Sequence, residues 1–224
     1  AEPSAESLDK PTVEGFGFEW TVYDQRKRDP ASIRATFERY FAKFPWDVLP
    51  DSALGVDVGS GSGRWAALVA ERGYRLVALD ASRDALNVTR TAVPSADVLN
   101  ASAVEMPLAS DAADFAFSLG VLHHLPNTEG ALAEIHRVLR PGGRLQAADI
   151  TLSQSVSGND KMDVSLWTGC IAGGLLEGEL RDLVAAAGFS GIEVVPGGEV
   201  FAGAPQASNA ADFGTRGAGI RAHR

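Results

Sequence analysis

From residue 54 onward, short apolar runs alternate with amphipathic stretches, and this alternation constrains the fold more than any other feature. The runs are typical of buried strands, and the stretches carry apolar residues at helical spacing with Gly or Pro at their ends. This pattern predicts an α/β fold with a doubly wound, mostly parallel sheet of seven strands, covered by helices on both faces. The expected strands are 54–58, 75–79, 97–99, 114–119, 144–150, 192–195 and 218–222, and the expected helices are 62–72, 82–92, 128–139 and two within 160–187.

The length of 224 residues suits one domain, and there is no internal repeat that would indicate a second. We expect residues 1–14 to be a flexible leader. Residues 15–50 should form an N-terminal lid and a helix that begins at Pro30 and carries an apolar stripe. Residues 51–224 should form the α/β domain itself. Phe18, in the aromatic-rich segment ahead of the helix, is expected to pack in the core.

Composition narrows the class of partner. The net charge of −9 argues against nucleic acid or an anionic membrane, because both bind basic surfaces. No apolar run approaches the roughly 20 residues of a membrane span. The single cysteine, Cys170, excludes an internal disulfide and is compatible with the cytoplasm, and no cluster has the spacing of metal ligands. We therefore expect a small-molecule partner and no metal, while the oligomeric state has no signal in the sequence.

The strongest local motif, VDVGSGSG at residues 56–63, lies between the first expected strand and the helix after it. Its glycines allow a tight turn and close approach of a ligand to the backbone, and the helix start offers free N–H groups. Asp80 ends the second strand, 21 residues beyond Gly59. In a doubly wound sheet its carboxylate would lie beside the same crevice and accept hydrogen bonds from ribose hydroxyls. Together these features predict a site for a nucleoside-containing ligand.

The glycines alternate as G-x-G-x-G, and Arg64 stands where a dinucleotide fold would have its third glycine. This pattern resembles the first motif of class I S-adenosylmethionine-dependent methyltransferases. The sequences DAADFAFSLG at 111–120, VLHHLP at 121–126 and RVLRPGG at 137–143 are similar to further motifs of these enzymes. The resemblance, to the type 11 and type 25 cores, implies the Rossmann-like methyltransferase fold for the α/β domain. It also implies S-adenosylmethionine as cofactor and S-adenosylhomocysteine as product.

By this resemblance the cofactor lies across the carboxyl ends of the strands. The glycine loop would contact the methionine part and Asp80 the ribose. Ser102 stands where many relatives have Asp, so a neutral hydrogen bond worth about 1 kcal/mol would serve the adenine. Ala81 would flank the adenine, and the end of the fourth strand would close the floor near the sulfonium. The implied cofactor residues are Asp57, Gly59, Ser60, Gly61, Gly63, Asp80, Ala81, Ser102, Ala103, Ser118 and Leu119.

Two residues that follow neighbouring strands are candidates for proton transfer, which is needed if the acceptor is a hydroxyl. His123 could take the proton, and Asp149 could orient its imidazole. The arrangement resembles certain O-methyltransferases that act on sugar-bearing natural products, although some C-methyltransferases of quinone synthesis also carry the His-His pair. The alternative is that His123 only caps or packs at the strand end. We expect His124 to be a packing neighbour of the acceptor pocket.

Two segments outside these motifs are expected to shape the acceptor pocket. Trp20 and Tyr23 belong to a segment that resembles an entry found ahead of the core in several bacterial methyltransferases, and they would form a lid or else anchor the helix. Trp167 and Cys170 lie in a stretch that resembles arsenite methyltransferases, whose cysteine there binds trivalent arsenic. Those enzymes rely on several cysteines, whereas Cys170 is alone and could simply pack.

The leading hypothesis is methyl transfer from S-adenosylmethionine to a small-molecule acceptor, chiefly a hydroxyl, with His123 as base. Arsenite methylation through Cys170, and C- or N-methylation of a metabolite, are the enzymatic alternatives. A non-catalytic cofactor-binding module is the alternative from another class. A nicotinamide oxidoreductase is opposed by Arg64 and by the lack of a Tyr/Lys or nucleophilic Cys pair.

Overall fold

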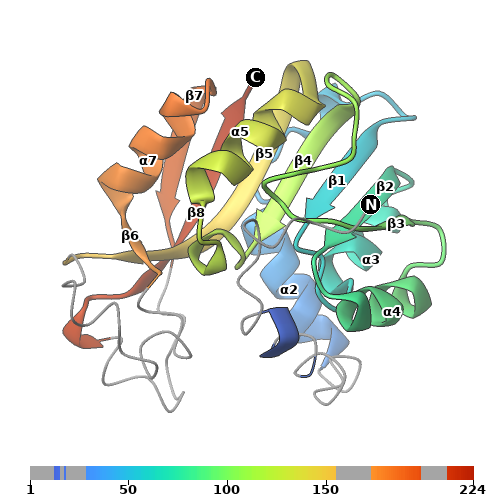
Figure 1. The fold of residues 1–224 in the computed structure, drawn as a ribbon, viewed down its shortest axis with the longest axis horizontal. Coiled ribbons are helices and arrows are strands. Elements are labelled where there is room, and N and C mark those ends of the chain that lie inside the picture. Colours follow the sequence, from blue (N-terminus) through green and yellow to red (C-terminus); the bar gives the residue numbers. More distant parts are fainter. Residues whose placement is uncertain (1–12, 16–17, 19–28, 155–172, 198–210) are drawn as a thin grey trace.

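The computed structural model describes residues 13–15, 18, 29–154, 173–197 and 211–224. Its centre is a sheet of eight strands in the order β3-β2-β1-β4-β5-β8-β7, with β6 pairing beside β5 (Figure 1). The strands are β1 Leu54–Val58, β2 Arg75–Asp80, β3 Asp97–Asn100, β4 Ala113–Leu119, β5 Leu139–Leu152, β6 Leu175–Leu176, β7 Ser190–Pro196 and β8 Arg216–His223. Within the described ranges only β8 runs antiparallel to its neighbours. The predicted doubly wound, mostly parallel α/β fold is confirmed.

Three of the described helices begin after a residue whose side chain caps them. Asp29 accepts hydrogen bonds from the first free N–H groups of one helix, and Ser82 does so for another. The helices are α2 Pro30–Tyr40, α3 Arg64–Ala70, α4 Arg83–Ala92, α5 Thr128–Val138 and α7 Glu177–Ala186, and the 3-10 turns are η3 Trp46–Val48 and η4 Leu122–His124. No helix in the described ranges combines the length and the apolar character that crossing a bilayer requires.

Two apolar layers hold the helices to the sheet. On one face α5 and α7 cover the strands, with Ile135 and Val184 buried against Ile220 and its neighbours (Figure 1). On the other face α2 and α3 pack on β4, where the rings of Phe37 and Phe41 join that of Phe117. Burial of a large side chain contributes about 1.5–3 kcal/mol, so these layers dominate the stability of the domain.

The order of the strands places a ligand crevice at their carboxyl ends. The chain passes from β1 to β2 and β3 on one side, and then crosses to β4 and β5 on the other. Loops that leave β1 and β4 therefore diverge, and in open α/β sheets ligands bind where this divergence occurs. The loop after β1 is the glycine motif, so the fold brings that motif to the crevice.

Three expectations need correction, and one stays open. Residues 175–176 are the short strand β6 and not helix, because they pair with Thr151 and Leu152. β5 begins at Leu139, five residues earlier than expected. Phe18 is 67% exposed, so it does not pack in the core. The division into a leader of residues 1–14, a lid region and the α/β domain remains a prediction.

Candidate active site

The glycine loop turns three times through left-handed backbone. Gly59, Gly61 and Gly63 have φ angles of 78°, 54° and 73°. The N–H groups of Gly59 and Ser60 both donate to the carbonyl of Leu79, at 2.8 and 3.0 Å, which ties the loop to β2. A Cβ at position 59 would lie 2.5 Å from Cγ2 of Val121. Glycine is therefore required there by both conformation and space.

Asp80 lies at the end of β2 with its carboxylate turned toward the glycine loop. Oδ2 accepts the backbone N–H of Gly61 and Oδ1 that of Ser82, each at 2.8 Å. Burial raises the pKa of Asp80, and these hydrogen bonds oppose the rise. Asn100 donates to the carbonyls of Asp80 and Ala81, at 3.0 and 2.8 Å, and so fixes the strand end. Each carboxylate oxygen keeps acceptor capacity for a ligand hydroxyl.

Besides Oγ of Ser62 in the loop itself, two buried polar groups on the strands beside the loop have no protein partner within the described ranges. They are Oδ2 of Asp57, a residue 2% exposed, and Oγ of Ser118, which is fully buried. Burial raises the pKa of Asp57 well above its usual range, the charge of Asp80 adds to the rise, and Arg64 opposes it. An unsatisfied buried polar group costs about 1–3 kcal/mol. An ammonium group would donate to Oδ2 of Asp57 and a carboxylate would accept from Oγ of Ser118, so these residues fit the amino-acid part of S-adenosylmethionine.

Ser102 and Ala103, expected beside the adenine, lie in the loop after β3 and are 2% and 7% exposed. Oγ of Ser102 accepts the backbone N–H of Val104 at 3.3 Å. The loop therefore reaches the same edge of the sheet as Asp80, because β3 pairs with β2 up to the Asp80–Asn100 position.

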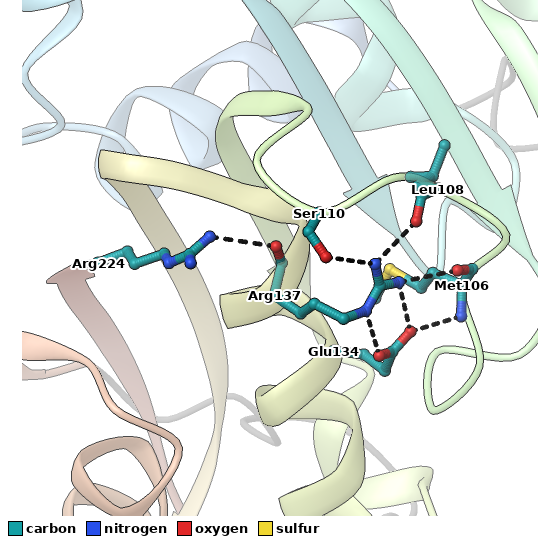
Figure 2. Close-up of polar contacts among 6 residues, drawn as sticks. All are labelled: Met106, Leu108, Ser110, Glu134, Arg137 and Arg224. Atoms are coloured by element: carbon teal, nitrogen blue, oxygen red, sulfur yellow. Dashed lines mark hydrogen bonds and ion pairs between the residues drawn. The ribbon is translucent and has the colours of Figure 1, made fainter.

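A charged pair on α5 holds the continuation of this loop (Figure 2). Arg137 donates to the carbonyl of Leu108 at 2.9 Å and to that of Met106 at 3.0 Å. Glu134 accepts the backbone N–H of Met106 at 2.9 Å and binds Arg137 at 2.6 Å. The hydrogen bond from Arg137 lowers the pKa of Glu134. The backbone of the loop at Met106 and Leu108 is thereby fixed to one helix, a role that the sequence pattern did not single out.

His123 and Asp149 meet as predicted. Nδ1 of His123 contacts Oδ1 of Asp149, and the backbone N–H of His123 donates to Oδ2 at 3.3 Å. Both residues are 7% exposed, and Nε2 of His123 is buried. The ring of His124 lies 3.7 Å from that of His123. Burial, followed by the neighbouring His123, lowers the pKa of His124 to about 3, so this ring is neutral at pH 7.

A cavity of about 740 Å³ opens beside these residues, on the face of the sheet that α2 covers. One end lies next to the glycine loop, at Arg64 and Trp65, where α3 begins. Leu119 and Gly120, at the end of β4, and the backbone region of Asp149 also line it. The cavity thus begins at the residues that directly follow the glycine loop, and of the His123–Asp149 pair it is lined by Asp149.

Thr89 is a site residue that the sequence interpretation missed. It is fully buried in α4, and its Oγ1 donates to the carbonyl of Gly61 at 2.8 Å. The signal was a hydroxyl on the inward face of the expected helix 82–92, three residues after Leu86. Of the expected acceptor-pocket residues, Trp20, Tyr23, Trp167 and Cys170 lie outside the described ranges.

The absence of a bound metal remains a prediction. Within the described ranges no three His, Cys, Asp or Glu side chains are grouped so that they could hold a metal ion.

Comparison with known families decides the class of the domain. A family model described as a methyltransferase domain matches residues 56–147. The chain carries a methyltransferase domain. The matched residues include the glycine loop, Asp80, Ser118 and His123, so the family match and the site geometry refer to the same part of the fold.

Similar proteins differ in what their names say they act on. An arsenite methyltransferase from Halobacterium salinarum is 26% identical over 149 residues, which is 63% of this chain and 38% of that protein. An O-methyltransferase from Pyrenophora dematioidea is 30% identical over 149 residues, 62% of this chain and 55% of that protein. The chain spans about two fifths of the length of the first curated relatives that it matches.

A solved structure gives the fold of the methyltransferase domain a direct parallel. The phosphoethanolamine N-methyltransferase 2 of Haemonchus contortus, in complex with S-adenosyl-L-methionine, superposes with a TM-score of 0.72. It is 15% identical, and the match covers 96% of this chain and 58% of that one. At this identity the likeness shows the fold alone.

Proposed function

We propose that the chain is an S-adenosylmethionine-dependent methyltransferase that acts on a small-molecule acceptor. The observation that carries the proposal is the pair of unpartnered buried groups, on Asp57 and Ser118, beside a glycine loop in a methyltransferase domain. When bound, S-adenosylmethionine supplies an electrophilic methyl group on its sulfonium. The net charge of −9 supports a small molecule over a nucleic acid as the acceptor.

In this proposal the chain's own residues bind the cofactor and orient the acceptor. Asp80 accepts the ribose hydroxyls with the acceptor capacity that its two backbone hydrogen bonds leave. Asp57 pairs with the ammonium, Ala81 and Ser102 flank the adenine, and Leu119 closes the floor near the methyl group. Methyl transfer is an in-line displacement, so holding the acceptor in line is the main catalytic requirement.

We further propose that the acceptor is a hydroxyl and that His123 is the base. Asp149 holds the Nδ1 side of the ring, which leaves Nε2 to take the acceptor proton as the oxygen–methyl bond forms. The buried carboxylate of Asp149 stabilises the resulting imidazolium. Because Nε2 is buried, the bound acceptor must open a path to it, and bulk water is then excluded from the proton transfer.

The test is release of S-adenosylhomocysteine from S-adenosylmethionine in the presence of separate acceptor pools: phenols and glycosides, amines, quinols, and arsenite with thiol. We expect turnover in the hydroxyl pool, and a fall in kcat of about 10²–10⁴-fold in His123→Gln with cofactor affinity unchanged. His136→Gln is the matched control, because His136 packs on Phe189 at the other end of α5. Cofactor binding without turnover in any pool would contradict the enzymatic proposal and favour a non-catalytic module.

Arsenite methylation is a second candidate because the arsenite methyltransferase of Halobacterium salinarum matches 63% of this chain. Thiolate ligands suit trivalent arsenic, and Cys170 is the chain's single cysteine. Turnover restricted to the arsenite pool and lost in Cys170→Ser would support this candidate over the hydroxyl acceptor. Unchanged activity of Cys170→Ser would exclude it.

A further inference from the structure

The cavity that begins at Arg64 and Trp65 extends well away from the glycine loop. It continues along the face of β5 from Ile150 to Gln146, four residues or roughly 13 Å at the usual rise of a strand. Its floor is formed by residues of β8, which pairs with β5: Gly217, Ala218, Gly219 and Arg221. One wall is α2, and Val195 of β7 lines the opposite side.

The floor of this extension is kept flat by glycine. Gly219 pairs with Ala148 on one side and with Val195 on the other. Alternate residues of β8, Ile220 and Ala222, are buried under the opposite helices, so Gly219 faces the cavity. Among the described residues, a Cβ built at Gly219 would come within 4 Å of Val195 alone, at 3.9 Å or more. The space above Gly219 is therefore open, and its lack of a side chain is not forced by packing.

The far end of the cavity is positively charged although the chain as a whole carries a net charge of −9. Arg39 lies in the last turn of α2 and Lys43 three residues beyond its end, and neither makes an ion pair within the described ranges. Arg221 is held in place, because its guanidinium donates to the carbonyl of Lys43 at 2.7 Å and pairs with Glu193. Among the described residues, no carboxylate neutralises the charges of Arg39 and Lys43.

A buried amide, that of Gln146, lies at the same end of the cavity. Gln146 is 1% exposed and lines the cavity, and its Oε1 has no hydrogen-bond partner among the described residues. Its Nε2 donates to the carbonyl of Ala147 at 3.2 Å. A buried amide oxygen without a partner is costly, so a ligand that carries a hydroxyl donor near it would be favoured.

We propose that this extension is the acceptor subsite and that it takes an elongated acceptor with an anionic group, a phosphate or a carboxylate, at the end remote from the glycine loop. Arg39 and Lys43 bind the anion, and the floor at Gly219 accommodates the body of the acceptor. The reactive end then lies at Gly120 and Arg64, beside the glycine loop. The inference rests on the proposed function, since it names the acceptor of the same reaction.

The test is calorimetric titration with 4-hydroxyphenyl phosphate, 4-hydroxyphenylacetate and hydroquinone, which share a phenol and differ in the anion. S-Adenosylhomocysteine is titrated separately. We expect at least one of the two anions to bind tenfold or more tightly than hydroquinone. This advantage should fall severalfold in Arg39→Gln and in Lys43→Gln, and should shrink as salt is raised. Arg34→Gln is the matched control, because Arg34 lies on the same helix but pairs with Glu71 outside the cavity.

A second variant tests the floor. Gly219→Leu should abolish binding of all three phenols while leaving the fold and the affinity for S-adenosylhomocysteine intact. Equal affinity for the anions and hydroquinone, or an anion advantage that survives in Arg39→Gln and Lys43→Gln, would overturn the inference. Failure to bind S-adenosylhomocysteine with normal binding of the anionic phenols would instead refute the proposed function and leave the anion subsite standing.

Discussion

The carboxylate of Asp149 contacts His123 twice, at the backbone N–H and at Nδ1 of the ring. A third hydrogen bond, from the backbone N–H of Ile150 at 2.8 Å, fixes Oδ1. The side chains of His123 and Asp149 are 6% and 2% exposed. Asp149 is thus held in one orientation and in turn holds the imidazole, as expected of a residue that positions a base.

If the two residues act as a unit, the losses in kcat caused by their substitutions should not be additive. We expect His123→Gln and Asp149→Asn each to lower kcat by about 10²–10⁴-fold, and the double variant to lose no more than the more damaging single one. Steady-state kinetics with a hydroxyl acceptor, with S-adenosylhomocysteine affinity as the control, measure this. Losses that multiply would show that the residues act independently.

Gly59 should be more sensitive to substitution than another glycine of the same conformation. Gly142 has a φ of 79° but open space around it, whereas a Cβ at Gly59 meets Val121. We expect Gly142→Ala to lower the free energy of unfolding by about 1–2 kcal/mol, the cost of left-handed backbone. Gly59→Ala should lose a further 1–3 kcal/mol or so by overpacking and should bind S-adenosylhomocysteine weakly.

Denaturant unfolding of both glycine variants checks this comparison. Adding Val121→Ala to Gly59→Ala should recover the overpacking part of the loss but not the part due to φ. Equal destabilisation of Gly59→Ala and Gly142→Ala would show that the contact with Val121 is unimportant.

Glu134 should matter for cofactor affinity although it lies away from the glycine loop. Glu134→Gln weakens the contacts that fix Met106 and Arg137 (Figure 2), and the loop that carries Ser102 should become mobile. We expect a severalfold weaker binding of S-adenosylhomocysteine and faster amide hydrogen exchange at residues 102–108. Glu129→Gln, an exposed position on the same helix, should change neither.

His124 should make stability depend on pH. Its pKa in the folded protein is about 3, below the ordinary value of 6.5, because burial disfavours the charged ring. The unfolded chain therefore binds the proton more readily. The stability linked to His124 is complete above pH 6.5 and decreases as the pH falls toward 3, by up to about 1.4 kcal/mol per pH unit.

Urea unfolding between pH 4 and 7.5 tests this dependence. As the pH falls, the free energy of unfolding of the wild-type protein should decrease relative to that of His124→Gln. A constant difference across the range would show that His124 is not buried in its neutral form.

The sequence by itself determined the elements and the glycine site. β1 spans Leu54–Val58 as expected, and α4 begins at Arg83, one residue after the expected start, because such elements depend on residues a few positions apart. The loop 59–63 was identifiable for the same reason, because its glycines and the strand and helix that flank it follow one another directly in the sequence. Asp80 followed from the geometry of a parallel sheet, which fixes where a strand end lies.

Only the tertiary structure decided how distant segments meet. Thr89 binds the carbonyl of Gly61 across 28 residues, and Arg221 binds that of Lys43 across 178. β6 formed where a helix was expected, because pairing with β5 outweighed local helical propensity. The cavity walled by Arg39 and floored by Gly219 exists because the sheet brings β8 beside β5. Residues far apart along the chain leave no periodic signal, so contacts between them are set by packing of the whole domain.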